Sequence, residues 1–189
     1  MVMEVGKYTY NANKIKIVWD IPAWNKKTKA VEQPKLKIGK FCSIGDGIIV
    51  YLGGNHRADW ITTYPFHIGS IHNQTFNKFK NENHGYPQTN GNVIIENDVW
   101  IGEGVTIMSG VKIGDGAVIA TNSHVVENVK PYSIIGGNPA KFYYFRFNEE
   151  TIKKLLELKW WDLDDKTINE ISPILCSSNY NELFKIFNK

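Results

Sequence analysis

The chain has 189 residues, of which 42% are hydrophobic and 13% aromatic, and its formal net charge is +3 at pH 7. This length suits one domain with a small appendage, and the apolar content excludes intrinsic disorder. No lysine and arginine run is long enough for a nucleic-acid surface, and no segment approaches the roughly 18 apolar residues of a membrane span. Two distant cysteines, Cys42 and Cys176, give neither a disulfide framework nor a zinc signature. We therefore expect a cytoplasmic protein without nucleic-acid or membrane partners.

Residues 1–35 form an N-terminal segment in which "YTYNANKIKIVW" indicates strands. A period of six begins in "LKIGKFCSIGDGIIVYLGG" with Ile38, Ile44 and Val50, and it resumes at Val93. From there one aliphatic set returns every six positions, and a second set lies two residues ahead of it. The two sets are Ile95, Ile101, Ile107, Ile113, Ile119 and Val125, and Val93, Val99, Val105, Val111, Ala117 and Ser123.

A period of six matches neither the 3.6 of an α-helix nor the alternation of a plain strand. It is typical of short strands joined by tight turns, where glycines permit positive φ and aliphatic side chains stack inside a solenoid. The alternative is a set of buried strands in an ordinary sandwich, and six consecutive aliphatic positions at one spacing argue against it. The sequence thus predicts an all-β solenoid over residues 36–130.

A polar and aromatic excursion, residues 53–92, interrupts the repeat and begins "GGNHRADWITTYPF". Loops of this length inside compact domains are often functional. His56 follows two glycines, which we expect to let the backbone approach another chain or a ligand. A hydrated loop histidine is the alternative interpretation. Arg57 and Asp59 either orient this loop or pair at the surface.

Residues 131–189 comprise an exit segment and C-terminal helices. The exit segment, "KPYSIIGGNPAKFYYFRF", is rich in turn signals. Asn148 then caps a helix whose apolar face continues to Trp160. A weaker helical stretch covers 165–171 before Pro173, and "YNELFKIF" is a third. These helices cap or flank the open solenoid end.

Five motifs together resemble the hexapeptide-repeat xenobiotic acetyltransferases, which include chloramphenicol and streptogramin acetyltransferases. They are "KIGKFCSIG", "NHRADW…TYPF", "NDVWIGEGVTIMSGVKIGDGAVIA", "PYSIIGGNPAK" and "LELKWWD". The resemblance runs from about Val5 to the C-terminus. It implies a left-handed parallel β-helix, acetyl-CoA as co-substrate, and a homotrimer with its sites between subunits.

The same resemblance implies that His56 is the general base that deprotonates an acceptor hydroxyl, with a backbone carbonyl holding its other ring nitrogen. Trp100 faces outward, because Val99 and Ile101 alternate around it, and the resemblance places it near the thioester. Interface packing is the alternative for Trp100, and a plain exposed lysine is the alternative for Lys141. The expected acetyl-CoA contacts are Trp100, Gly102, Gly110, Ala120, Thr121 and Lys141, and the expected acceptor contacts are Asn55, Tyr64 and Phe66.

We therefore predict an acetyl-CoA-dependent O-acetyltransferase acting on a small molecule. The acceptor is a hydroxyl of a sugar or glycan precursor, which the polar excursion favours, or of a hydroxylated antibiotic. One alternative is a chloramphenicol- or streptogramin-type enzyme specifically, and another is a non-catalytic β-helix scaffold. A metal-dependent β-helix hydratase is disfavoured because His124 has no second repeat histidine at a ligand-like spacing, so no metal is expected.

Overall fold

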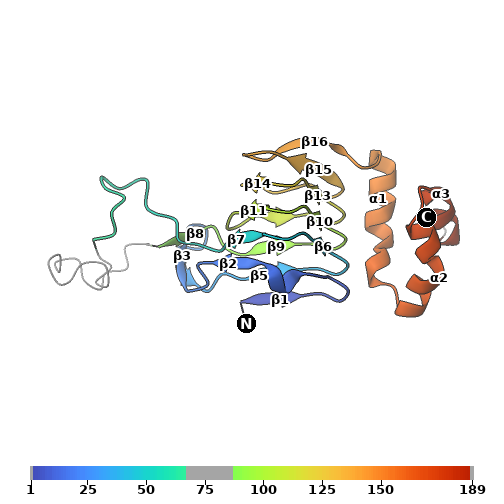
Figure 1. Cartoon of the computed structure of the whole chain (residues 1–189), viewed down its shortest axis with the longest axis horizontal. Helices are drawn as coiled ribbons and strands as arrows, with labels where there is room; N and C mark the ends of the chain where they lie inside the picture. Colours follow the sequence, from blue (N-terminus) through green and yellow to red (C-terminus); the bar gives the residue numbers. More distant parts are fainter. Residues whose placement is uncertain (1, 67–86, 188–189) are drawn as a thin grey trace.

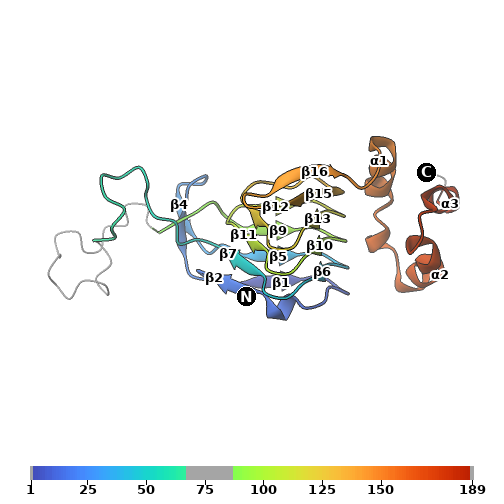
Figure 2. The ribbon, with the colours of Figure 1, turned by 45° about the horizontal axis from the view of Figure 1, so that its top comes forward.

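The computed structural model describes residues 2–66 and 87–187, and its body is a parallel β-helix with three sheets (Figures 1 and 2). Sheet one contains β1 (Met3–Val5), β5 (Leu36–Ile38), β9 (Val93–Ile95) and β12 (Lys112–Ile113). Sheet two contains β6 (Ser43–Ile44), β10 (Trp100–Ile101), β13 (Val118–Ile119), β15 (Ser133–Gly136) and the antiparallel β16 (Lys141–Phe145). Sheet three contains β2 (Lys16–Val18), β7 (Ile49–Tyr51), β11 (Thr106–Ile107) and β14 (His124–Val125).

The interior consists of the two aliphatic sets that the sequence spacing predicted. Every member of both sets is at most 2% exposed in the structure. One turn of the helix takes 18 residues, or three hexapeptides, since Trp100 pairs with Val118 and Thr106 with His124. Burying a side chain of this size contributes about 1.5–3 kcal/mol, so these stacked ladders dominate the stability of the body.

The β-helix begins earlier than the expected boundary at residue 36. β1 pairs in parallel with β5, Tyr10 bridges to Ser43, and β2 pairs with β7, so residues 3–18 form a complete first coil. The spacing of six is kept in this coil between Val5, Asn11 and Ile17, but Asn11, which precedes the 3-10 turn η1 (Ala12–Lys14), interrupts the aliphatic set.

Two insertions leave the coils at the corner that follows sheet three. The first is a hairpin of β3 (Ala23–Asn25) and β4 (Ala30–Glu32). The second is the excursion after β7, which returns through β8 (Gln88–Thr89), a strand that pairs in parallel with β3. A small sheet of three strands therefore supports both ends of the excursion.

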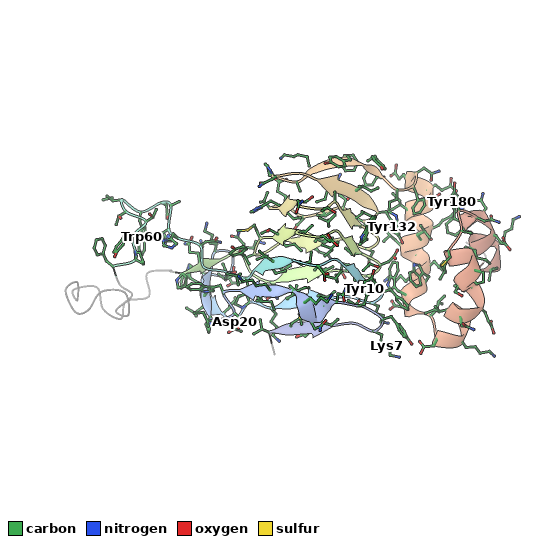
Figure 3. The ribbon with its side chains drawn as sticks, viewed as in Figure 1. Lys7, Tyr10, Asp20, Trp60, Tyr132 and Tyr180 are labelled. Carbon is green, nitrogen blue, oxygen red and sulfur yellow. The ribbon has the colours of Figure 1, made fainter. Side chains whose placement is uncertain are left out.

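The C-terminal helices pack at the corner between sheets one and two (Figure 3). They are α1 (Glu149–Leu158), η2 (Trp160–Asp162), α2 (Asp165–Leu175) and α3 (Tyr180–Ile186). Tyr132 is 1% exposed and joins the apolar cluster of the helices, and the Phe41 ring lies 4.7 Å from that of Trp160. The predicted helices are present, but they cover a corner along the coils rather than the open end of the solenoid that the sequence analysis expected.

The first helix begins at its expected cap, since the Asn148 side chain accepts a hydrogen bond from the Thr151 amide at 2.8 Å. The second helix differs from the prediction because it continues through Pro173 to Leu175. Proline cannot donate to the carbonyl of residue 169. The Ser172 hydroxyl donates to that Asn169 carbonyl instead, at 2.9 Å, so the missing bond is replaced.

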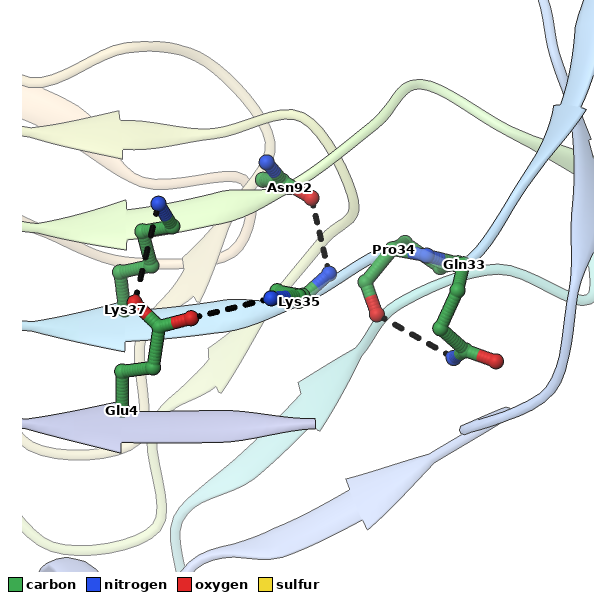
Figure 4. A network of polar contacts seen from close by, with 6 residues as sticks. All are labelled: Glu4, Gln33, Pro34, Lys35, Lys37 and Asn92. Carbon is green, nitrogen blue, oxygen red and sulfur yellow. Dashed lines mark hydrogen bonds and ion pairs between the residues drawn. The ribbon is translucent and has the colours of Figure 1, made fainter. Parts of the chain in front are cut away.

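The outer face of sheet one is charged. The Glu4 carboxylate on β1 forms salt bridges with Lys35 Nζ at 3.1 Å and with Lys37 Nζ at 3.7 Å. The Asn92 side chain accepts a hydrogen bond from the Lys35 backbone amide (Figure 4). The outer face of sheet two is apolar by contrast, with Trp100, Val118, Ile134 and Tyr144 in register across four strands. These two faces of the prism therefore present different chemistry to a partner.

Candidate active site

A row of small residues follows the inward isoleucines at the corner between sheets two and three. The row contains Gly45, Gly102, Ala120 and Gly136. A Cβ on Gly102 would stand 2.7 Å from the Thr121 backbone nitrogen and 2.8 Å from its Oγ1. Glycine at 102 is therefore required by the tight stacking of coils. The structure does bring Gly102, Ala120 and Thr121 together, as the expected acetyl-CoA contacts require.

Gly110 lies elsewhere. It belongs to the corner after sheet three, where its amide donates to the Gly91 carbonyl and a Cβ would stand 2.6 Å from Asn90. Within one chain Gly110 therefore does not line the same surface as Gly102. The six-residue spacing concealed this, because 18 residues per turn place positions eight apart at different corners.

The two glycines before His56 pack against Trp19. A Cβ on Gly53 would stand 2.8 Å from the indole Cδ1, and one on Gly54 would stand 2.9 Å from Cε3. Gly54 also has a φ of 85°. The backbone at these glycines does approach another group closely, as expected, but that group is the Trp19 indole of the same chain and not a ligand or another chain. Asn55 then pairs with Gln88 through two backbone hydrogen bonds, which direct the next residue outward.

His56 is exposed and its ring is held by the loop. Its Nδ1 lies 2.7 Å from the Thr63 carbonyl oxygen. A carbonyl only accepts hydrogen bonds, so this contact assigns the proton to Nδ1 and leaves the lone pair on Nε2. This is the backbone contact that the sequence analysis expected for a catalytic histidine.

Arg57 and Asp59 pair with each other beside His56. Arg57 Nε donates to Asp59 Oδ1 at 2.7 Å, a second guanidinium nitrogen contacts the other carboxylate oxygen, and the guanidinium lies 5.1 Å from the Trp60 ring centre. This bidentate contact lowers the pKa of Asp59 to about 2. The pair stiffens the loop and remains charged throughout the physiological range.

Tyr64 and Phe66 lie on the same loop, and their rings are 4.9 Å apart in an edge-on arrangement. They are 46% and 37% exposed, so an apolar surface continues beyond His56. The loop extends away from the β-helix on the side opposite the helices, as Trp60 shows in Figure 3. His67, His72 and His84 lie outside the described residues.

Trp100 and Lys141 lie on sheet two. Trp100 is 58% exposed on the outer face of β10, as its alternation predicted. Lys141 begins β16 opposite Gly136 and lines a cavity of about 430 Å³ at the end of the coils, together with Phe142 and Phe145. Both residues therefore border the corner that carries Ala120.

The predicted base lies at the corner after sheet three, where Gly110 also lies, whereas three of the predicted acetyl-CoA contacts lie at another corner of the chain. The excursion with His56 leaves after sheet three, whereas Gly102, Ala120 and Thr121 follow sheet two. A whole prism face separates the two sets. One chain alone thus does not assemble both halves of the expected site.

Two contributors to this region were missed by the sequence analysis. Trp19, with a φ of 65°, lies behind the histidine loop, and its indole nitrogen is buried without a hydrogen-bond partner among the described residues. Tyr143 lies over Gly136, next to Ala120. Neither residue belongs to a repeat, and no local pattern marks them.

The described ranges, 2–66 and 87–187, contain no group of three or more histidine, cysteine, aspartate or glutamate side chains placed to hold a metal ion. They also contain no helix with the length and apolarity needed to cross a membrane.

The three-sheet β-helix with its histidine-bearing excursion defines the hexapeptide-repeat class of transferases. The family model described as bacterial transferase hexapeptide (six repeats) matches residues 92–127. A hexapeptide-repeat containing acetyltransferase from Vibrio cholerae has a similar fold, with a TM-score of 0.50 at 24% identity over 78% of this chain and 64% of that one. The predicted left-handed parallel β-helix with C-terminal helices is thereby confirmed.

Curated relatives define the family more closely. A probable macrolide acetyltransferase of Lysinibacillus sphaericus is 48% identical over 82% of this chain and 85% of its own length. A chloramphenicol acetyltransferase of Agrobacterium fabrum is 41% identical over 81% and 72%. A virginiamycin A acetyltransferase of Staphylococcus aureus is 48% identical over 79% and 66%. The chain belongs to the hexapeptide-repeat xenobiotic acetyltransferase family, and its enzyme class is that of the acetyltransferases.

Proposed function

We propose that the protein transfers the acetyl group of acetyl-CoA to a hydroxyl of an antibiotic, with His56 as general base. The observation that carries this assignment is the 2.7 Å contact between His56 Nδ1 and the Thr63 carbonyl. This contact selects the tautomer that can accept a proton at Nε2. The family membership supplies the reaction class.

The residues account for the movement of one proton. The acceptor hydroxyl gives its proton to His56 Nε2 as its oxygen attacks the thioester carbonyl carbon. The C–S bond then breaks, and the imidazolium returns the proton to the leaving thiolate. The Thr63 carbonyl stabilises the positive charge on the ring between these steps, and such a base contributes about 10²–10⁴-fold to the rate.

The complete site forms between copies of this chain arranged as a homotrimer. The separation of His56 from Gly102, Ala120 and Thr121 by a prism face supports this, since a neighbouring copy can bring its histidine loop to that corner. The apolar outer face of sheet two, with Trp100 58% exposed, offers the surface to be covered. Cyclic assembly of identical prisms is the usual way for such faces to be buried.

The acceptor is a hydroxylated antibiotic. The names of the macrolide, chloramphenicol and virginiamycin A acetyltransferases support this class over a sugar, although the polar excursion favoured a sugar in the sequence analysis. Asn55, Tyr64 and Phe66 contribute the acceptor side. The exposed edges of the Tyr64 and Phe66 rings suit a large, partly apolar molecule.

The test is the release of CoA thiol from acetyl-CoA with chloramphenicol, a streptogramin, macrolides, sugars and nucleotide sugars as acceptors. Wild type, His56→Ala and the matched control His124→Ala are compared. We expect antibiotic-dependent release that falls about 10²–10⁴-fold in His56→Ala and is unchanged in His124→Ala. Release that survives His56→Ala would overturn the assignment of the base. Release with sugars alone would overturn the acceptor class, and absence of CoA binding would favour a scaffold.

A further inference from the structure

The last strand of sheet two contains a β-bulge that changes the direction of one tyrosine side chain. Ile134 pairs with Tyr144, whereas the next residue, Ile135, pairs with Phe142, so Tyr143 is the extra residue of β16. Bulges re-aim side chains and are frequent beside active sites. The bulge here turns Tyr143 away from the cavity lined by Phe142 and Phe145.

Tyr143 lies against Gly136. A Cβ on Gly136 would stand 2.6 Å from the tyrosine hydroxyl, 2.9 Å from its ring and 2.9 Å from Ala120 Cβ. Only glycine, which has no Cβ, leaves room for the Tyr143 ring at position 136. The hydroxyl, on a side chain that is half exposed, is thereby held next to Ala120, within the row of small residues.

The position along the coil axis indicates what this hydroxyl meets. β16 follows β15, β13 and β10 in sheet two, so it lies three strand spacings, or about 14 Å, beyond the level of Trp100. The histidine loop leaves at the level of β7, which is farther still from β16. Tyr143 is therefore remote from the reacting atoms, but it lies at the same corner, between sheets two and three, as Gly102 and Ala120.

We propose that Tyr143 is a donor-recognition residue whose hydroxyl donates a hydrogen bond to an oxygen of CoA remote from the thioester. That oxygen belongs to the pantetheine amides or to the phosphates, which share the chemistry of a hydrogen-bond acceptor. Lys141, another of the expected acetyl-CoA contacts, begins the same strand and pairs with Gly136. The proposal rests on the proposed function, since it assigns a residue to the same donor site.

The proposal is tested with Tyr143→Phe, which removes only the hydroxyl. The matched control is Tyr144→Phe, a neighbouring tyrosine that is 59% exposed against 54% for Tyr143. Loss of one hydrogen bond predicts a Kd for CoA about three- to tenfold weaker in Tyr143→Phe, by calorimetry, and no change in Tyr144→Phe. Because the hydroxyl is remote from the chemistry, KM for acetyl-CoA rises by the same factor and kcat is unchanged.

Shorter donors locate the contact. S-acetylpantetheine lacks the phosphates and the adenosine, and S-acetyl-N-acetylcysteamine lacks most of the pantetheine arm as well. An effect of Tyr143→Phe with acetyl-CoA alone places the acceptor oxygen in the phosphate-bearing nucleotide part of CoA, and an effect that persists with S-acetylpantetheine identifies an amide; both support the proposal. An equal effect with all three donors, or an unchanged Kd, would overturn it. The Kd for CoA is measured without an acceptor, so it tests this proposal even if the proposed acceptor class is wrong.

Discussion

Gly54→Ala tests the role assigned to the glycines that precede His56. The φ of 85° at Gly54 costs an alanine about 1–2 kcal/mol. Its Cβ would also stand 2.9 Å from Trp19, and such crowding costs about 1–3 kcal/mol. Together these penalties predict a loss of about 2–5 kcal/mol. For a chain of this size that lowers the melting temperature by about 4–20 °C.

Gly53→Ala separates the two contributions. Its Cβ would approach the same indole to 2.8 Å, but Gly53 has no positive φ, so only the crowding applies. Calorimetric melting of both variants should place Gly53→Ala between wild type and Gly54→Ala. Strain that displaces the loop instead would appear as a lower acetyl-transfer rate, because His56 follows two residues later. A Gly54→Ala protein with both the melting temperature and the rate of wild type would refute the reasoning.

Two further predictions concern thiols and the first helix. Burial raises the pKa of Cys42 to about 11, whereas Cys176 is exposed. A disulfide reagent at neutral pH should therefore titrate one thiol in the native protein and two after denaturation; two native thiols would contradict the buried placement of Cys42. Asn148→Ala removes the cap of α1 and should cost about 1 kcal/mol in thermal unfolding. Asn148→Asp retains an acceptor and should melt close to wild type, so equal losses in both variants would contradict the capping role.

The sequence by itself determined the architecture of the body. A hexapeptide period specifies which side chains point inward, because every third corner returns to the same face after 18 residues. The exposed Trp100, the buried ladders and the cap at Asn148 all follow from such local rules. The identity of His56 as the candidate base also followed from its motif, and its contact with Thr63 agrees with that interpretation.

Only the tertiary structure decided which corner each candidate occupies and what lies against it. Gly110 is separated from Gly102 although both are repeat glycines, since a spacing of eight residues is not a multiple of one turn. The contacts of Trp19 with Gly53 and of Tyr143 with Gly136 join segments that carry no repeat. The bulge in β16 is a matter of pairing between strands, and pairing leaves no mark in the order of residues. The period of the sequence determines whether a side chain points inward or outward. Which residues then contact that side chain depends on how the whole chain folds.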